Sequence, residues 1–324
     1  MRVVFVSSGK EHNNISPIIE NQGKSLIANG IDISYYTINN KGLFGYIKHI
    51  SYLRKFLKKG KYDIIHAHYG LSAWVCIFAK TNEKLLVSFM GDDIIGSNRK
   101  NGTITISSKL IASINKLLTK YVYDYAIVKS EEMKNKMWSR NIEVIPNGVD
   151  LELFKPIPYM EARKKINVIS NAKIQAYFIS DPNRIEKNFN FANNLINELK
   201  SIYQIELFVI HNIQHNQLVN YYNAANFLIM TSYHEGSPNV IKEAMACNCP
   251  IITTDVGDVR WVIGDTEGCI ISSFDRYEFK QGLIKIIEYS MYHKKTNGRQ
   301  RIINLGLENN TINKRISGIY SKLI

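Results

Sequence analysis

The chain has 324 residues, of which 45% are hydrophobic, 11% aromatic and 21% charged, a balance that excludes fibrous, low-complexity and largely disordered proteins. Lysine and arginine number 41 against 28 aspartates and glutamates, so the formal net charge is +13. This excess favours anionic partners such as nucleic acid, anionic lipid or phosphorylated small molecules, and it does not choose among them.

Cysteine usage and the N-terminal segment indicate a cytoplasmic protein. Cys76, Cys247, Cys249 and Cys269 are too few and too scattered for a disulfide framework or a zinc site, so we expect four reduced thiols. The first ten residues, MRVVFVSSGK, enter a predicted strand directly and do not resemble a signal peptide. The longest apolar run, 71–79, is far shorter than the roughly 20 residues of a membrane-spanning helix.

The first half of the chain alternates short apolar runs with segments of helical spacing. The predicted helices cover 17–29, 44–59, 71–80, 107–120 and 131–140. The predicted strands cover 3–6, 33–36, 63–67, 85–89, 125–128 and 144–145. Nearly continuous apolar strands that alternate with helices predict a doubly wound α/β domain with a parallel sheet.

A boundary follows, because Pro156 and Pro158 discourage both a helix and a central strand. After a short helix at 159–165 the same rhythm begins again. Strands are predicted at 176–179, 205–210, 227–230, 251–254 and 269–271, and helices at 188–200, 216–223, 238–247, 277–290 and 310–323. Two α/β halves predict a cleft in which ligands bind at the carboxyl ends of the strands.

The most informative stretch is YHEGSPNVIKEAMACNCPIITTDVG, residues 233–257. Ser237 suits an N-cap and Pro238 the first position of a helix. Such a helix presents free N–H groups near Asn239 and Val240 together with the positive end of its dipole. We expect it to bind a phosphate or a polar sugar.

Glu235 and Glu243 are two carboxylates of this stretch, one expected in the loop and one in the helix. Both can face one ligand from different heights and accept hydrogen bonds from its hydroxyls. Gly236 between them lets a ligand approach the backbone closely. The alternative is that Glu235 is a loop charge and Glu243 an exposed helix position.

A second candidate anion site is the segment DPNRIEK, where Arg184 and Lys187 follow a predicted strand. Arg184 can fork onto phosphate oxygens and Lys187 supplies a point charge. The alternative is a solvated basic loop. Gly9 follows the first strand without a GxGxxG pattern, which argues against a conventional dinucleotide fingerprint.

Together these residues resemble the retaining glycosyltransferases of family 4 (glycosyl transferases group 1). EGSPNVIKE resembles the EX7E motif of that family, and its surroundings at 221–259 resemble the donor-binding block. The other similar segments are VIPNGVDLELFKP, SDPNRIEKN, DIIHAHYG and VSFMGDD. The similarity covers nearly the whole chain.

The resemblance implies a GT-B fold of two Rossmann-like domains that face each other across a cleft. The acceptor-binding domain would be 1–157 and the donor-binding domain 158–304, with a C-terminal helix of about 305–324 packing back on the first domain. The donor would be a nucleotide-diphosphate sugar, with UDP or GDP as its nucleotide, bound without a metal or other cofactor.

The resemblance also implies roles for single residues. Arg184 and Lys187 would neutralise the diphosphate, Glu235 would hold the transferred sugar and Glu243 the ribose. The donor-binding set would be completed by main-chain groups at Gly236, Ser237, Pro238, Asn239 and Gly9. We favour front-face attack with retention of configuration, in which the leaving phosphate takes the proton of the acceptor.

The acceptor side departs from the family. Many relatives have a histidine at the position of Met90 in VSFMGDD, and a methionine side chain can neither donate a hydrogen bond nor carry a proton. Asp92, Asp93 and His68 are the candidates to stand in for it. Each has a structural alternative, a helix cap for the aspartates and a core position for the histidine.

Residues 45–61, GYIKHISYLRKFLKKGK, alternate apolar and basic side chains at helical spacing. One interpretation is a core-packed helix with a solvated basic face. The other is peripheral docking to anionic lipid at the inner face of the plasma membrane. Docking would suit an enzyme that extends a lipid-linked glycan.

The resemblance therefore implies a metal-independent hexosyltransferase of bacterial surface-polysaccharide biosynthesis, of the capsule, exopolysaccharide, O-antigen or teichuronic acid type. It would use a glycan or polyprenyl-linked acceptor. The alternatives are a nucleotide-sugar epimerase on the same fold and a non-catalytic nucleotide-sugar-binding scaffold. A nucleic-acid-binding protein is suggested only by the net charge, and no zinc-finger or RNA-binding motif supports it.

Overall fold

The computed structural model describes residues 1–9, 15–39, 42–96, 104–167, 173–293 and 295–324. The chain divides into two compact units. The first contains Met1–Ser97, Ile104–Gly148 and Asn309–Ile324, and the second contains Val149–Glu308. The sequence boundary was expected at 157/158 and the return to the first domain at about 305.

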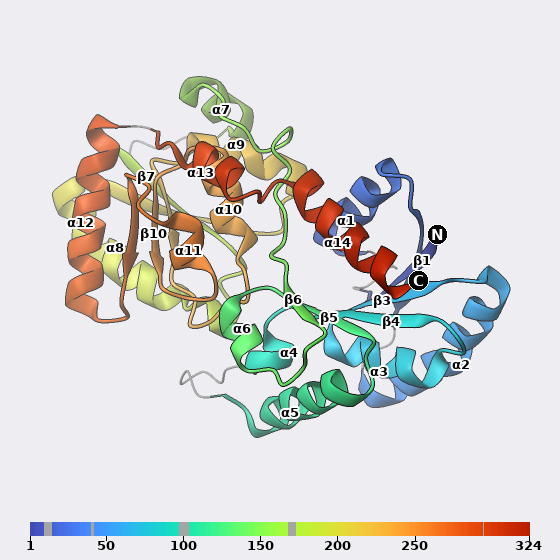
Figure 1. Ribbon diagram of the computed structural model, residues 1–324. Helices are drawn as coiled ribbons and strands as arrows, with labels where there is room; N and C mark the ends of the chain where they lie inside the picture. The colour runs from blue at the N-terminus through green and yellow to red at the C-terminus, as the bar shows by residue number, and fades with distance from the viewer. Residues whose placement is uncertain (10–14, 40–41, 97–103, 168–172, 294) are drawn as a thin grey trace. The chain divides into compact units, whose positions relative to one another are not determined.

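The first unit contains a parallel sheet of strand order β2-β1-β3-β4-β5-β6 (Figure 1). Its strands are β1 (Arg2–Ser8), β2 (Asp32–Ile38), β3 (Ile64–His68), β4 (Lys84–Ser88), β5 (Tyr125–Val128) and β6 (Ile142–Val144). Its helices are α1 (Pro17–Ala28), α2 (Gly42–Gly60), α3 (Gly70–Ala79), α4 (Asp92–Ile95), α5 (Ile106–Tyr121), α6 (Glu131–Asn135) and α14 (Asn309–Leu323). The strand order reverses direction between β1 and β3, as it does in doubly wound sheets.

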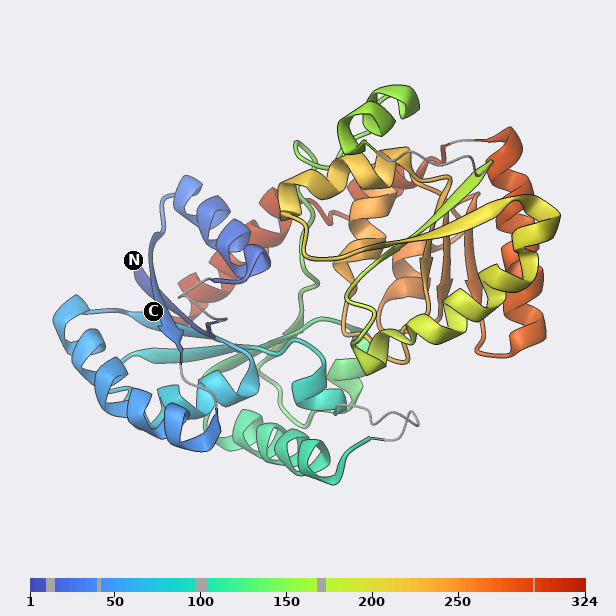
Figure 2. The same cartoon turned by 180° about the vertical axis from the view of Figure 1, so that it is seen from behind.

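Alternate residues of these strands bury opposite faces of the sheet. Val4, Ile65 and Val87 belong to a core that also contains Leu53 of α2 and Cys76 of α3. Helices α2, α3 and α5 lie on this side of the sheet, and α1 and α14 lie on the other (Figures 1 and 2). Both faces of the strands are therefore covered, which is why the strands read as continuous apolar runs.

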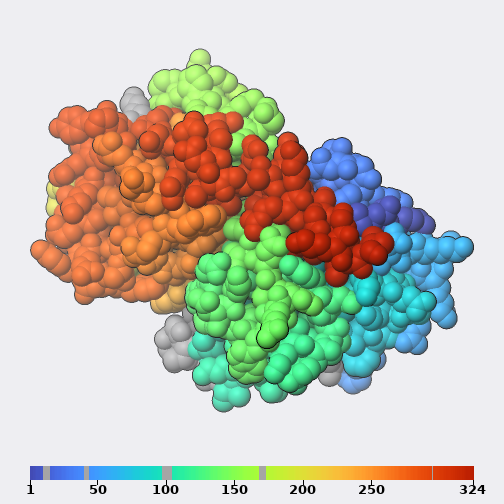
Figure 3. Space-filling model, in the orientation of Figure 1, coloured from blue at the N-terminus to red at the C-terminus, as the bar shows by residue number. Residues whose placement is uncertain are grey.

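The C-terminal helix α14 packs on the first unit, against α1 and the sheet (Figure 3). The hydroxyl of Tyr320 lies 2.6 Å from Nδ1 of His66, and Nε2 of His66 lies 2.7 Å from Oγ of Ser88. All three side chains are buried. At the edge of the sheet, Arg315 donates to the carboxylate of Glu143 at 2.9 Å.

The second unit contains a parallel sheet of order β11-β10-β9-β7-β8. Its strands are β7 (Ile174–Ile179), β8 (Ile205–Ile210), β9 (Phe227–Met230), β10 (Ile251–Thr254) and β11 (Cys269–Ser272). Its α-helices are α7 (Tyr159–Ile166), α8 (Phe189–Tyr203), α9 (Leu218–Ala224), α10 (Asn239–Ala246), α11 (Val259–Ile263), α12 (Arg276–Tyr292) and α13 (Gly298–Asn304). Two 3₁₀ turns, η1 (Ile185–Lys187) and η2 (His215–Gln217), precede α8 and α9.

The two parallel sheets confirm the predicted fold class, and two details differ from the sequence prediction. Helix α6 ends at Asn135, well before the predicted end at residue 140. The short helices α4, α11 and α13 were not predicted. The four cysteines are free, and three of them are buried in the core.

Within the described residues, no helix has the length and apolar character that crossing a bilayer requires.

The buried contact between His66 and Tyr320 gives a first prediction. Tyr320→Phe keeps the packing of the ring but leaves Nδ1 of His66 without its hydroxyl partner. We expect the free energy of unfolding to fall by about 1–3 kcal/mol in urea titrations followed by circular dichroism. Tyr292→Phe removes a hydroxyl from an exposed ring and serves as the control. Equal stability of the two variants would contradict a structural role for this contact.

Candidate active site

The candidate site of the second unit lies at the carboxyl ends of β7, β9 and β10. These strands are neighbours in the order β10-β9-β7, and the strand order reverses direction between β7 and β9. Loops that follow such strands diverge at a topological switch point, where α/β proteins bind ligands. The loops after β7 and β9 carry Arg184, Lys187 and Glu235, and Asp258 follows β10.

Lys187 and Glu235 form an ion pair that joins the first two loops. The Nζ atom of Lys187 lies 2.5 Å from Oε1 of Glu235, and the two side chains are only 15% and 16% exposed. The backbone reinforces the junction. Tyr233 N donates to the carbonyl of Glu186 at 2.8 Å, and the hydroxyl of Thr231 donates to the carbonyl of Asn188 at 2.9 Å. A lysine and a glutamate 48 positions apart in the sequence are thereby held side by side.

Arg184, in contrast, lies apart from this pair. Its side chain is 53% exposed, and its Nε donates to Oε1 of Glu186 at 2.6 Å. The sequence expectation placed Arg184 and Lys187 on one diphosphate. In the structure Lys187 contacts Glu235, whereas Arg184 is turned to solvent with a different carboxylate as its partner.

Glu243 belongs to α10 and is almost fully enclosed. Its Oε1 lies 2.8 Å from Nε2 of His215, and its Oε2 accepts from the hydroxyl of Tyr222 at 2.7 Å. The hydrogen bond to this carboxylate raises the pKa of His215, against the opposing effect of burial. Burial, together with the charge of Glu243, raises the pKa of the Tyr222 hydroxyl. Glu243 is therefore held on both carboxylate oxygens.

The start of α10 differs from the sequence prediction. The helix begins at Asn239, with Pro238 at the N-cap position, and no side chain caps it there. The hydroxyl of Ser237 donates to Asp258 and accepts from the ammonium of Lys242 instead. Lys242 Nζ and Asp258 Oδ2 are 3.6 Å apart and both side chains are buried, so the cluster fixes Ser237 from the side of the β10 loop.

Glycine is required where the loop after β10 meets the loop after β9. Gly257 has φ +60, and a Cβ atom there would lie 2.7 Å from the carbonyl oxygens of Glu235 and Gly236. Both contacts are with backbone atoms, which cannot move aside as the end of a flexible side chain could. Gly236 is itself buried, and its carbonyl oxygen lies where the loop after β10 comes close.

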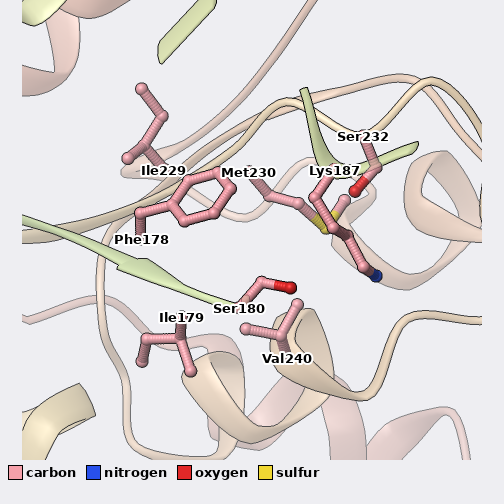
Figure 4. A pocket seen from close by; sticks show the side chains of 8 residues that line it. All are labelled: Phe178, Ile179, Ser180, Lys187, Ile229, Met230, Ser232 and Val240. Atoms are coloured by element: carbon pink, nitrogen blue, oxygen red, sulfur yellow. The ribbon is translucent and has the colours of Figure 1, made fainter. Parts of the chain in front are cut away.

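A pocket opens beside Lys187 (Figure 4). It is lined by Phe178, Ile179, Ser180, Lys187, Ile229, Met230, Ser232 and Val240, from the ends of β7 and β9 and from α10. The hydroxyl of Ser232 is buried without a hydrogen-bond partner in the described structure, and so is the amide oxygen of Asn239. Buried polar atoms without partners are uncommon and mark places where a ligand or water completes the bonding.

The acceptor-side candidates lie in the first unit. Asp93 is buried, and its carboxylate accepts from the backbone N–H groups of Gly70, Met90 and Gly91 at 3.0 Å each. Burial raises its pKa to about 6. Asp93 thus shapes the turn after β4, and Asp92 begins the short helix α4.

His68 and Gly9 complete the first-unit set. His68 is buried at the end of β3, where its ring stacks on His66 and meets the edge of Phe5. Burial lowers its pKa to about 3, so the ring is neutral. Gly9 follows β1 and donates its N–H to the carbonyl of Ile38. The acceptor roles of His68, Asp92 and Asp93 stay predictions.

Four residues of the site were missed by sequence reasoning: His215, Tyr222, Lys242 and Asp258. Each acts through a partner 5 to 28 positions away, and the hydrogen bonds connect loops that the sequence does not place side by side. Of the four, only Lys242 had a signal in the sequence, because it is a charged residue inside the EX7E motif. Helix α10 is buried on nearly all sides, so this lysine has no solvated position on it. No group of three or more metal-ligating side chains gathers among the described residues.

Comparisons with known proteins agree with this architecture. The chain is 25% identical over 303 residues to the UDP-Gal:alpha-D-GlcNAc-diphosphoundecaprenol alpha-1,3-galactosyltransferase of Escherichia coli, covering 82% of this chain and 77% of that protein. Sucrose-phosphate synthase of Thermosynechococcus elongatus has a similar fold, with a TM-score of 0.78 at 19% identity over 99% of this chain and 98% of that one. The Anabaena protein HepE, solved in complex with UDP, has a TM-score of 0.72 at 15% identity over 99% and 100% of the two chains.

Family models match both halves of the chain. The model described as Glycosyltransferase Family 4 matches residues 10–153, and the model described as Glycosyl transferases group 1 matches residues 189–304. The second match contains Glu235, Glu243 and the whole of α10. The chain therefore belongs to the group 1 and family 4 glycosyltransferases, and its fold is GT-B.

Proposed function

We propose that this glycosyltransferase moves a hexosyl unit from a nucleotide-diphosphate sugar to a glycan or lipid-linked acceptor, with retention of configuration, in the assembly of a bacterial surface polysaccharide. A galactosyltransferase relative whose name states a UDP-sugar donor and a diphosphoundecaprenol-linked acceptor supports the substrate class. HepE, a fold neighbour, is solved with UDP-glucose. The reaction would take place on the cytoplasmic side of the membrane.

The observation that carries the proposal is the Lys187–Glu235 pair beside the open start of α10. Lys187 lines the pocket together with Val240 of the first turn of α10. A diphosphate in this place would meet the lysine and the positive end of the helix dipole. Glu235, released from Lys187, would then accept hydrogen bonds from the hydroxyls of the transferred sugar.

Arg184 supplies the second cation in this proposal. Its exposed side chain is paired with the neighbouring Glu186, so rotation toward an incoming diphosphate breaks a solvent-exposed pair. Such pairs contribute about 0–1 kcal/mol, which a bidentate contact with phosphate exceeds. Gly9 and the backbone of 236–239 would complete the donor contacts.

Glu243 would bind the two ribose hydroxyls. Each of its carboxylate oxygens already accepts one bond, from His215 or Tyr222, and retains a further lone pair. The two partners fix the carboxylate plane, so binding the ribose does not require Glu243 to be ordered first. The family resemblance assigns the ribose to Glu243, and this arrangement supports that assignment.

The proposed chemistry needs charge stabilisation rather than a protein nucleophile. As the bond between the sugar and the phosphate breaks, negative charge develops on the diphosphate, and Lys187, Arg184 and α10 stabilise it. The acceptor oxygen attacks the same face of the sugar, and its proton passes to the leaving phosphate. We propose that no metal or other cofactor takes part.

Lys187→Met tests the diphosphate contact. Loss of one hydrogen bond to a charged group is expected to weaken UDP binding about tenfold to a hundredfold in isothermal titration calorimetry. It should slow donor turnover about 10²–10³-fold. Lys200→Met, which removes an exposed lysine of α8, is the matched control. If Lys187→Met binds UDP as the wild type does, the proposed site is wrong.

The acceptor requirement separates the transferase from its alternatives. Mass spectrometry of the wild type with a panel of UDP- and GDP-sugars should show transfer to added lipid-linked acceptor, with only slow hydrolysis in its absence. Rapid release of free nucleotide and an altered sugar without acceptor would instead indicate an epimerase. Nucleotide binding with no turnover on any acceptor would indicate a scaffold.

The His215–Glu243 contact predicts a pH dependence of stability. Because Glu243 raises the pKa of His215 above its ordinary value of about 6.5, the pair stabilises the fold fully below that pH. This contribution is lost as pH rises through the raised pKa. Urea titrations at about pH 5.5 and about pH 9 should show a larger deficit for His215→Gln at the lower pH. A deficit that grows with pH, or one shared by the exposed-site control His293→Gln, would contradict the assignment.

A further inference from the structure

Helix α5 packs its polar side against the rest of the first unit. Its buried residues are Ser108, Ala112, Asn115 and Thr119, which recur at the spacing of one helix face. Asn115 donates to the carbonyl of Asp93 at 2.9 Å and accepts from the indole of Trp74 at 2.7 Å. The helix is therefore fastened by these hydrogen bonds and small side chains, together with Leu118, which packs partly buried against the core.

Four large apolar side chains of α5 lie on its outer side. Ile106, Leu110, Leu117 and Tyr121 are 77%, 61%, 52% and 68% exposed. At about 100° per residue they project within about 40° of the direction opposite to the buried stripe. A surface helix of a globular protein normally shows the reverse pattern, with its apolar side inward. The fold does not use this apolar stripe.

A row of lysines flanks the stripe. Lys109, Lys116 and Lys120 all lie on one side of it, and α5 contains no aspartate or glutamate. Lysine side chains in such a position can keep their ammonium groups in water while their methylene stems cover apolar surface. An apolar stripe bordered by lysines is typical of helices that lie in the plane of a membrane interface.

The two neighbouring helices extend the same surface. Trp74 joins α3 to α5, and α2 packs beside α3, so the three lie next to one another on one side of the sheet (Figures 1 and 2). None of them contains an acidic residue. Their exposed apolar side chains include Phe44 and Ile47 of α2 and Phe78 of α3, and the basic residues of α2 are Lys48, Arg54, Lys55, Lys58 and Lys59.

The sequence prediction had assigned the docking stripe to α2 alone. In the structure, Leu53 and Leu57 are buried and Ile50 and Phe56 pack against the core. Most of the apolar stripe of α2 therefore belongs to the fold, and this helix contributes mainly positive charge. The apolar part of the surface comes from α5.

We propose that the outer surface of α2, α3 and α5, hereafter the α2–α3–α5 face, docks on an anionic lipid bilayer with α5 lying in the interface. Anionic headgroups complement a face that carries lysine and arginine without any opposing acid. Each basic residue near such a surface strengthens binding by about fivefold. The exposed apolar stripe would enter the boundary between headgroups and acyl chains.

Charge also separates this occupant from a second copy of the chain. A dimer through the same face would bring two acid-free basic surfaces together, and like charges oppose such contact at low ionic strength. An anionic bilayer removes that repulsion and accommodates the same apolar side chains. The observations therefore favour lipid over self-association.

Binding is measured by co-sedimentation of the full chain with phosphatidylglycerol-containing vesicles and with pure phosphatidylcholine vesicles. No donor or acceptor is present, so the result does not depend on the proposed function. We expect binding to the anionic vesicles that weakens at high salt, and little binding to the neutral ones. Absence of binding to anionic vesicles would overturn the proposal.

Two double variants divide the apolar and electrostatic parts. Leu110→Ser with Leu117→Ser should weaken binding at least about tenfold, and Lys109→Glu with Lys120→Glu at least about twenty-fivefold. The matched control, Ile202→Ser with Lys200→Glu, alters an exposed apolar residue and a lysine of α8 in the second unit and should bind as the wild type does. Equal binding by all three variants would contradict the assignment to α5.

A fluorescence probe of α5 tests the proposal even if the double variants fail to fold. Tyr121→Trp places an indole on the exposed stripe, and its fluorescence should shift to the blue on addition of anionic vesicles but not of neutral ones. An unchanged spectrum would place α5 outside the bilayer.

Sedimentation velocity tests the alternative occupant, a second copy of the chain. If the wild type is a dimer and Leu110→Ser with Leu117→Ser converts it to a monomer, the face joins two copies of the chain and the lipid proposal is overturned.

Discussion

The parallel order β10-β9-β7 is the constraint on which the candidate site depends. Because three neighbouring strands run in the same direction, the loops that follow them begin at one edge of the sheet. Lys187, Glu235, Glu243 and the cluster of Ser237, Lys242 and Asp258 all lie on these loops or on α10. The partners of Glu243 come from the segment after β8, His215 from η2 and Tyr222 from α9. The ion pair between Lys187 and Glu235 then fills a second role. An enclosed lysine without a partner would be costly, and Glu235 satisfies it until an anion takes its place.

Much of the fold could be predicted from the sequence, because both halves alternate apolar strands with helices and leave little choice of sheet type. The elements that were missed are α4, α11 and α13, which span only 4 to 7 residues and are too short to show a helical period. The end of α6 was misplaced for a related reason. Residues 136–140 continue the helical spacing, but Lys136 and Met137 close the helix with turn-like hydrogen bonds to its last carbonyls.

The sequence indicated some charged residues of the candidate site but not the residues that hold them in place. Glu235, Glu243 and Lys187 stand in a recognisable motif, and the family assignment is confirmed by models that match both halves of the chain. Ser237 shows where local reasoning fails. A serine before a proline suits an N-cap, but the hydroxyl of Ser237 donates to Asp258, which is distant in the sequence. Helix periodicity has the same limit for α2 and α5, since it locates an apolar stripe without saying whether that stripe faces the core.

The central claim is that the loops after β7 and β9, with the start of α10, hold a nucleotide diphosphate. A crystal structure of the protein soaked with a UDP- or GDP-sugar tests it most directly. The account predicts diphosphate oxygens at about 2.7–2.9 Å from Nζ of Lys187 and near the first N–H groups of α10, with Glu235 released from the lysine and turned to the sugar. A nucleotide bound elsewhere, with the Lys187–Glu235 ion pair intact beside it, would contradict the account.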